Sequence, residues 1–440
     1  MISLGCPKTL VDSEVILGKL DPAQYQITNQ ANGCDVVLLN TCSFIHDAQK
    51  ESVDHILQLV EMKKQKKIKS LVVMGCLVQE FSGDLQKELK EVDAFLGSSD
   101  YGKIPQVIEK VTHGTKVFAV GDPGYLSTAK EHRIALTPKH YRYVKISEGC
   151  DHICSFCTIP SFRGKHRSRT LEDVVAESKN LVQGGAKEII LTGQDTSYFG
   201  KDYSGEYLLA KLLKELDQKS GAEWIRLLYL YPSCVSQELI HAIRDSERVC
   251  KYVDMPLQHA SDAMLQAMRR GITKRRTYDL IDKFRSAMSD FAFRTTFIVG
   301  FPGETDQDFK ELLQMIRDQE FDRVGIFKFS KEENSHAALL PDQVSDKVKD
   351  ERWHEAMAVQ REISEKKMKR QLGKTLKVLI EAPSQKEKNV WVGRSEMDAP
   401  DIDGCVFVHS KSPLTIGEFC QVTIQETRAY DLVGISRTTA

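Results

Sequence analysis

The most constraining feature of the sequence is a short loop with three cysteines, Cys150, Cys154 and Cys157, in the spacing C-x3-C-x2-C. A loop of this size can offer three thiolates to a single metal cluster. A cubane 4Fe-4S cluster normally takes four cysteines, so a loop that supplies three leaves one iron free to bind a ligand that is not protein. The spacing therefore indicates a cluster that performs chemistry, and the chain must fold around it.

A structural zinc site is the main alternative at this loop. Such a site usually has a second C-x2-C pair or a Cys/His pair downstream. Neither follows Cys157 within a plausible distance in the sequence. His152 lies between two of the cysteines, and we expect it to face solvent or to lie beside the metal rather than to bind it. The loop favours an iron-sulfur cluster over zinc.

The length and charge of the chain limit the classes of protein to which it can belong. With 440 residues, of which 41% are hydrophobic, the chain predicts two or three packed domains. Its 61 basic and 62 acidic residues nearly cancel, so the balance requires neither nucleic acid nor an anionic membrane as a partner. The longest apolar runs, such as 36–39, are far shorter than the roughly 20 residues that cross a bilayer. Eleven cysteines without a secretory signal favour a reducing, cytoplasmic location.

The N-terminal part, to about residue 120, alternates apolar strand-like runs with amphipathic helical stretches, which predicts an α/β domain with a doubly wound parallel sheet. Cys6, Cys42 and Cys76 each come directly after a strand-like run. Because the carboxyl ends of parallel strands meet at one edge of a sheet, we expect these three thiols to converge. A single free cysteine is more often part of a core, but the shared placement favours a second three-cysteine cluster. The remaining cysteines are interpreted as structural: Cys34, Cys234, Cys250, Cys405 and Cys420.

A turn-rich break from Gly121 to about Arg133 marks a linker to the next domain. Beyond it, strand-like runs alternate with helical stretches and predict a partial (β/α)6 barrel. The six runs are Tyr143–Ile146, Glu188–Leu191, Trp224–Leu230, Tyr252–Met255, Arg294–Val299 and Val324–Phe329. Active sites of such barrels collect at the carboxyl ends of the strands. Here those ends carry the cysteine loop and the runs 192–195, 231–232, 256–259 and 300–304.

The C-terminal part begins after a charged, helix-favouring segment at 351–371. Short strand-like runs with turns between them predict a small antiparallel barrel. These runs are Thr375–Ala382, Asn389–Glu396, Cys405–His409, Phe419–Glu426 and Leu432–Ser436. The predicted domains are therefore residues 1–121, 133–366 and 369–437.

Two further motifs resemble those of the radical S-adenosylmethionine (SAM) methylthiotransferases. They are the run 160–169, Pro-Ser-Phe-Arg-Gly-Lys-His-Arg-Ser-Arg, and the run 191–195, Leu-Thr-Gly-Gln-Asp. The resemblance spans nearly the whole chain and implies an N-terminal domain with an auxiliary cluster, a radical SAM core and a C-terminal TRAM barrel. The implied cofactors are two 4Fe-4S clusters and SAM.

Two branches of that family differ in substrate. One modifies an adenosine of transfer RNA, and the other modifies an aspartate of a small-subunit ribosomal protein, protein twelve. The runs 3–8 (Ser-Leu-Gly-Cys-Pro-Lys), 11–14, 159–161 and 228–232 resemble the ribosomal-protein branch, whereas the RNA-modifying branch typically has Gln-Met after the first cysteine. Thr9 departs from the asparagine that is usual in the family. The first strand is also shorter than is usual, which leads us to expect an initiation site upstream.

The charge of the predicted C-terminal barrel agrees with the ribosomal-protein branch. Residues 372–440 hold eight Lys and Arg against nine acidic residues. A barrel that grips RNA is expected to be distinctly basic, because phosphate contacts supply most of the non-specific affinity. Direct RNA binding is therefore not expected, although the charge alone leaves the transfer-RNA methylthiotransferase open. A non-catalytic iron-sulfur protein that binds RNA through its TRAM barrel is a further hypothesis, against which the open irons argue.

The resemblance also implies a mechanism. SAM on the open iron of the Cys150, Cys154 and Cys157 cluster would give a 5′-deoxyadenosyl radical after one-electron reduction, and this radical would take hydrogen from the β-carbon of the aspartate. Sulfur is expected on the open iron of the other cluster, methylated by a second SAM. The implied partners are the ribosomal protein, an electron donor such as flavodoxin, and a sulfur donor.

Five residues are candidates for holding SAM. In the family the aromatic residue before the third cysteine, here Phe156, lies against the adenine of SAM. Gly193, Gln194, Gly300 and Gly303 lie at predicted strand ends, where glycines permit close approach of the backbone to a ligand. Ordinary turn geometry is the alternative explanation for them.

Overall fold

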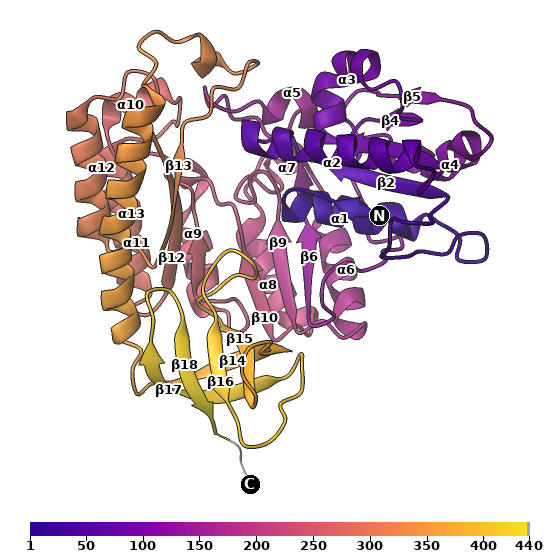
Figure 1. The fold of residues 1–440 in the computed structure, drawn as a ribbon. Coiled ribbons are helices and arrows are strands. Elements are labelled where there is room, and N and C mark those ends of the chain that lie inside the picture. The colour runs from indigo at the N-terminus through magenta and orange to yellow at the C-terminus, as the bar shows by residue number, and fades with distance from the viewer. Residues whose placement is uncertain (438–440) are drawn as a thin grey trace.

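In the computed structural model, which describes residues 1–437, the N-terminal part of the chain forms a parallel five-stranded sheet in the order β1-β2-β3-β4-β5 (Figure 1). Its strands are β1 Ile2–Ser3, β2 Val36–Thr41, β3 Ser70–Gly75, β4 Ala94–Leu96 and β5 Val117–Ala119. The helices between them are α1 Pro7–Gly18, α2 His46–Lys64, α3 Cys76–Glu88, η1 Tyr101–Lys103 and α4 Ile104–Thr112.

Both faces of this sheet are covered by helices. On β2, the side chains of Val37 and Leu39 pack with α2 and α3, whereas Leu38 points to the opposite face and packs with α1 and α4. Strands buried on both faces read as continuous apolar runs rather than as alternating ones. This explains the sequences of β2 and β3, and the predicted parallel α/β fold is confirmed.

The central part of the chain builds an open barrel from two parallel three-stranded sheets, β6-β9-β10 and β11-β12-β13. The two sheets meet where the Leu230 amide donates to the Asp254 carbonyl at 2.9 Å. The strands are β6 Tyr141–Lys145, β9 Glu188–Thr192, β10 Trp224–Leu227, β11 Tyr252–Asp254, β12 Ala292–Val299 and β13 Arg323–Lys328, with a small separate pair β7 Ser147–Glu148 and β8 Arg167–Ser168. The predicted six-stranded partial barrel is confirmed.

The longer helices of this part pack against the outside of the barrel. They are α6 Leu171–Gln183, α8 Leu209–Lys219, α9 Gln237–Asp245, α11 Lys274–Ala287, α12 Asp306–Gln319 and α13 Asp346–Lys369. The shorter helices lie in the connections between these elements: α5 Ile159–Arg163, α7 Lys201–Ser204, η2 Pro232–Cys234, α10 Asp262–Ala267 and η3 His336–Leu339. Figure 1 shows α13 running along the outer side of the strands toward the C-terminal barrel.

One predicted strand is too long. The run Trp224–Leu230 was expected to be extended, but β10 ends at Leu227. Tyr229 adopts φ 63°, in the left-handed region that side chains other than glycine rarely enter. The amide of Tyr229 donates to Asp254 Oδ2 at 2.9 Å, which stabilises this turn and ends the strand.

The C-terminal part is a closed five-stranded barrel in the order β14-β15-β16-β18-β17. Its strands are β14 Thr375–Pro383, β15 Val390–Ser395, β16 Val406–His409, β17 Phe419–Thr427 and β18 Leu432–Ser436. The prediction of an antiparallel barrel holds for every neighbouring pair except β16 and β18, which are parallel. A closed ring with an odd number of strands cannot alternate direction throughout, so one parallel pair is required.

Buried ion pairs attach this barrel to the central strands. Glu188, the first residue of β9, accepts from Arg226 Nε at 2.7 Å and from Arg394 Nη2 at 2.6 Å. Glu188 and Arg226 are fully buried, and the side chain of Arg394 is 3% exposed. The C-terminal barrel therefore sits at the amino ends of the central strands, opposite to the end that carries the cysteine loop.

None of the helices within residues 1–437 combines the length and the apolar character that a transmembrane helix requires.

Candidate metal centres

Cys150, Cys154 and Cys157 line one cavity of about 560 Å³ at the carboxyl end of the central strands. The loop that carries them lies between β7 and α5. Gly149, at φ 76°, brings the loop so close to the segment after α5 that a Cβ atom there would lie 2.1 Å from the Lys165 carbonyl oxygen. Only glycine fits at this point, and it turns the cysteines toward the cavity.

Burial holds the thiols of Cys150 and Cys157 in their neutral form when no metal is bound. It is the main cause that raises the pKa of Cys150 and of Cys157, each to about 12. Arg270 lies beside Cys154, and its Nη1 donates to Cys154 Sγ at 3.3 Å. A bound metal would have to displace the thiol protons, which it does by stabilising the thiolates directly.

His152 does not point into open solvent, which was one of the two positions expected for it, but lies beside the cysteines. Its Nε2 is 2.6 Å from Asp195 Oδ2, and its ring stacks on Tyr231 with centroids 3.5 Å apart. Cys234 lies within 4.8 Å of this pair and completes a set of three groups that could hold a metal ion. Asp195 Oδ1 already accepts from the Ser197 amide at 2.9 Å. These contacts give His152 and Asp195 hydrogen-bond partners without a metal, and they hold the cysteine loop against Tyr231.

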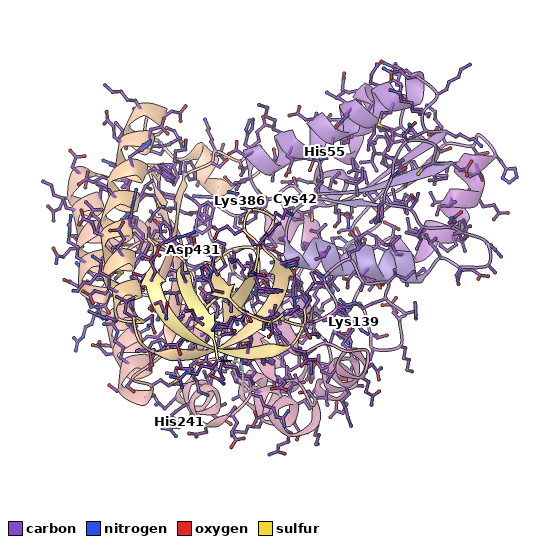
Figure 2. All side chains as sticks on the ribbon, turned by 60° about the horizontal axis from the view of Figure 1, so that its bottom comes forward. Cys42, His55, Lys139, His241, Lys386 and Asp431 are labelled. Atoms are coloured by element: carbon purple, nitrogen blue, oxygen red, sulfur yellow. The ribbon has the colours of Figure 1, made fainter. Side chains whose placement is uncertain are left out.

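The other three cysteines converge at the carboxyl edge of the N-terminal sheet. Thr41 and Gly75 are paired residues at the ends of the neighbouring strands β2 and β3. Cys42 and Cys76 are the next residues along the chain, so they lie side by side at this edge. Cys6 precedes α1, and a Cβ atom on Gly5 would lie 2.9 Å from Cys42 Sγ. Figure 2 shows Cys42 on the side of the N-terminal sheet that faces the rest of the molecule.

Burial, nearby charges and neighbouring thiols shift the pKa values of this triad. Burial is the main cause that raises the pKa of Cys42, and the nearby Cys6 adds to it. Burial also raises the pKa of Cys76 to about 12, with Cys42 and Cys6 contributing and Arg163 opposing. At Cys6 burial again acts upward, but Lys8 and bonds from Thr9 outweigh it and lower the pKa. Three mutually close thiols form a donor set that fits a cluster with one open iron.

Gly75 is required for this convergence, and its replacement gives a first prediction. At Gly75, φ is 103°, and a Cβ atom would lie 2.3 Å from Asn40 Oδ1 and 2.7 Å from the Thr41 carbonyl oxygen. We expect Gly75→Ala to displace Cys76 and to lower the iron content after anaerobic reconstitution from about eight to about four per chain. Gly83→Ala, in α3, the helix that begins at Cys76, is the matched control, because the new methyl would have no atom within 4 Å. Wild-type iron content in Gly75→Ala would contradict the placement of Cys76.

A buried network of charges joins the two triads. Lys145, on β6, pairs with Asp12 of α1 and with Glu148, which lies two residues before Cys150. Arg163 Nη1 lies 3.0 Å from Asp12 and 3.3 Å from Glu148, and its Nη2 donates to Cys76 Sγ at 2.9 Å. The side chains of these four charged residues are at most 5% exposed. Lys145 and Arg163 outweigh the effect of burial on Glu148 and hold its pKa below the usual range.

The sequence did not predict this network, because a lone charged residue in a loop or strand gives no signal of its partner. Two acids and two bases balance within it, which is the condition under which buried charges are tolerated. The network fixes the N-terminal sheet edge against the cysteine loop, so the two triads keep a defined relative position.

The residues predicted to hold SAM lie in separate places around the carboxyl ends of the strands. Phe156 packs against an apolar cluster that includes Met268 and Phe301. Gln194 Nε2 donates to Glu148 at 3.2 Å, and a Cβ atom on Gly193 would lie 2.6 Å from Ser147 Oγ.

The two later glycines are placed differently. Gly300, at φ 71°, is buried against Lys349, and its amide donates to Glu304. Gly303, at φ 80°, is exposed, and a Cβ atom added there would have no neighbouring atom within 4 Å. Turn geometry accounts for a glycine at both positions, so SAM contact by all five residues stays a prediction.

The match to known families follows the three parts of the fold. Residues 144–316 match the Radical SAM superfamily, residues 1–97 match the Uncharacterized protein family UPF0004, and residues 372–436 match the TRAM domain. The chain is 44% identical over 435 residues to the ribosomal protein uS12 methylthiotransferase RimO of Desulforamulus reducens, covering 99% of this chain and 98% of the relative. RimO of Geobacter sulfurreducens is 42% identical over 435 residues, with 99% and 97% covered.

Among solved structures, the chain is similar to the radical S-adenosylmethionine methyltransferase TsrM from Kitasatospora setae, solved with tryptophan substrate and the SAM analog aza-SAM bound. The TM-score is 0.50 at 14% identity, with 67% of this chain and 62% of that chain covered. At this identity the likeness concerns the fold alone.

Proposed function

Because the chain belongs to the RimO family of ribosomal protein uS12 methylthiotransferases, we propose that it adds a methylthio group to the β-carbon of an aspartate of uS12. The observation that carries this function is the identity of 44% over 99% of the chain. That identity extends through all three parts of the fold rather than through the radical SAM part alone.

Radical SAM methylthiotransferases use SAM and 4Fe-4S clusters, and two donor sets in this chain suit those groups. We propose that Cys150, Cys154 and Cys157 hold the cluster that binds SAM, and that a second cluster is held by Cys6, Cys42 and Cys76. Once provided with an electron and with sulfur by separate donors, these groups would supply radical formation and sulfur transfer. We further assign Phe156, Gly193, Gln194, Gly300 and Gly303 to SAM binding.

The chain's own residues have three tasks in this proposal. Arg163 and Lys145 hold the N-terminal sheet edge against the cysteine loop, which keeps the site of sulfur delivery beside the site of radical formation. The pair of His152 and Asp195, stacked on Tyr231, holds the loop in shape. Fixed geometry of this kind lowers the entropic cost of bringing the reacting groups together.

Partners and location extend the proposal. We infer that the reaction takes place in the cytoplasm, with an electron donor such as flavodoxin and a separate sulfur donor. One-electron reduction of a cluster needs such a donor. The near-neutral C-terminal barrel suits contact with a basic ribosomal protein better than contact with RNA.

The choice between uS12 and transfer RNA can be tested directly. We expect the reconstituted enzyme, given SAM and a reductant, to add a methylthio mass to uS12 and to leave transfer RNA unchanged, as measured by mass spectrometry of both. The matched control is uS12 with its target aspartate replaced by alanine, which should gain no mass. A methylthio group on transfer RNA and none on uS12 would overturn the proposed function in favour of the adenosine-modifying branch.

A further inference from the structure

Lys8 lies beside the Cys6, Cys42 and Cys76 triad and, among residues 1–437, has no carboxylate partner. It lies two residues after Cys6, on the first turn of α1, and is half-buried. Within residues 1–437 no carboxylate lies close enough to form an ion pair with its ammonium, whereas the neighbouring cations Lys145 and Arg163 each pair with two acids. A partly buried ammonium normally finds a counter-ion. Lys8 acts on the Cys6 thiol, but no carboxylate of this part of the chain pairs with it.

Tyr229 of the central barrel holds the Lys8 side chain in place. Lys8 Nζ lies 3.7 Å from the centroid of the Tyr229 ring. Two hydrogen bonds fix the backbone of Tyr229 at φ 63°: its N–H donates to Asp254 Oδ2 at 2.9 Å, and its carbonyl accepts from the Thr196 amide at 3.1 Å. Strained conformations of this kind persist where the surrounding structure enforces them, and they cluster at functional sites.

The contact with Tyr229 orients Lys8 but does not satisfy it. A ring face attracts a cation without accepting its hydrogen bonds, and an ammonium has three N–H donors. No hydrogen bond joins Lys8 Nζ to another described residue of the chain. The arrangement is therefore preorganised for a ligand that carries negative charge and hydrogen-bond acceptors.

We propose that Lys8 binds the side-chain carboxylate of the target aspartate, an inference that rests on the proposed function. The reacting β-carbon is bonded to that carboxylate, so a cation that holds the carboxylate also fixes the carbon. Sulfur delivered from the Cys6, Cys42 and Cys76 triad requires the β-carbon to lie near Cys6, which is where Lys8 is. An adenosine offers no carboxylate to this site, so Lys8 also favours a protein substrate over transfer RNA.

The competing explanation is that Lys8 serves only to stabilise the Cys6 thiolate. The two roles differ in what they predict about the substrate. A residue that serves the cluster alone treats an aspartate and an asparagine target alike, because both fill the same volume. A residue that binds the carboxylate discriminates between them, because the amide has no charge to pair.

The test compares uS12 with its natural target aspartate and uS12 with asparagine at that position. Binding is measured as the half-saturating concentration of each protein for stimulating or inhibiting 5′-deoxyadenosine release by the reconstituted enzyme. We expect the wild-type enzyme to favour aspartate by roughly ten- to a hundredfold. In Lys8→Met that preference should fall to near unity, and Lys8→Arg should retain part of it. Lys50→Met, at an exposed position on α2, should keep the full preference.

Each other outcome contradicts a specific part of the argument. If the wild-type enzyme binds the aspartate and asparagine forms of uS12 equally well, Lys8 does not bind the target carboxylate. This result comes from the wild-type enzyme alone, so it holds even if Lys8→Met fails to fold. An unchanged preference in Lys8→Met, with or without loss of iron, assigns Lys8 to the cluster and also overturns the proposed role. Failure of the proposed function is seen separately, because the wild-type enzyme would then leave natural uS12 unmodified.

Discussion

Cys154→Ala is expected to abolish both SAM cleavage and methylthiolation, whereas Cys42→Ala should keep part of the SAM cleavage and lose only sulfur insertion. The reason is that each cysteine belongs to a different donor set. Cys154 lines the cavity at the end of the central strands and accepts from Arg270 at 3.3 Å. Cys42 lies at the edge of the N-terminal sheet. Loss of one of three ligands leaves a cluster too few thiolates to be retained.

Two measurements on the reconstituted proteins check this prediction: 5′-deoxyadenosine released per chain, and methylthio groups added to uS12. Cys420→Ala, in the C-terminal barrel on β17, is the matched control and should behave as wild type in both. Full SAM cleavage by Cys154→Ala would contradict the assignment of the compact loop. Complete loss of SAM cleavage in Cys42→Ala would show that the two centres do not work independently.

The positions of both triads could be predicted from the sequence because each rests on a local rule. The spacing of the compact loop brings its three cysteines together within eight residues. The other three follow apolar runs, and the carboxyl ends of parallel strands share one edge of a sheet. The apolar runs of the N-terminal part also predicted its sheet, because strands that are buried on both faces are typical of a parallel sheet covered by helices.

The contacts that orient the triads could not be predicted, because they join residues far apart in the chain. Lys145 is 133 residues from Asp12, and Arg163 is 151 residues from it. No periodicity or spacing links such positions in a single sequence. The end of β10 was missed for a related reason. Tyr229 is a good strand residue, and it is held in a turn by hydrogen bonds to residues distant in the chain, Asp254 of β11 and Thr196.

Arg163→Met is expected to lower the free energy of unfolding of the metal-free protein by about 3–5 kcal/mol, because it leaves a buried acid without its partner. Arg163 and Lys145 together balance Asp12 and Glu148. Without the guanidinium, two buried carboxylates share one ammonium. Arg163→Lys keeps the positive charge, but its ammonium lacks the planar guanidinium that contacts both acids and Cys76. The free energy of unfolding of Arg163→Lys should therefore lie between those of Arg163→Met and the wild type.

Guanidinium denaturation of the three proteins measures this difference, with Arg275→Met on the exposed face of α11 as the control. A structural salt bridge alone would change only stability. Because Arg163 also donates to Cys76 Sγ at 2.9 Å, the variant should in addition release more 5′-deoxyadenosine for each methylthio group transferred. The two triads would no longer keep a fixed relative position, so radicals would form without transfer of sulfur to the substrate. Unchanged stability together with an unchanged ratio of the two products would show that the network does not couple the centres.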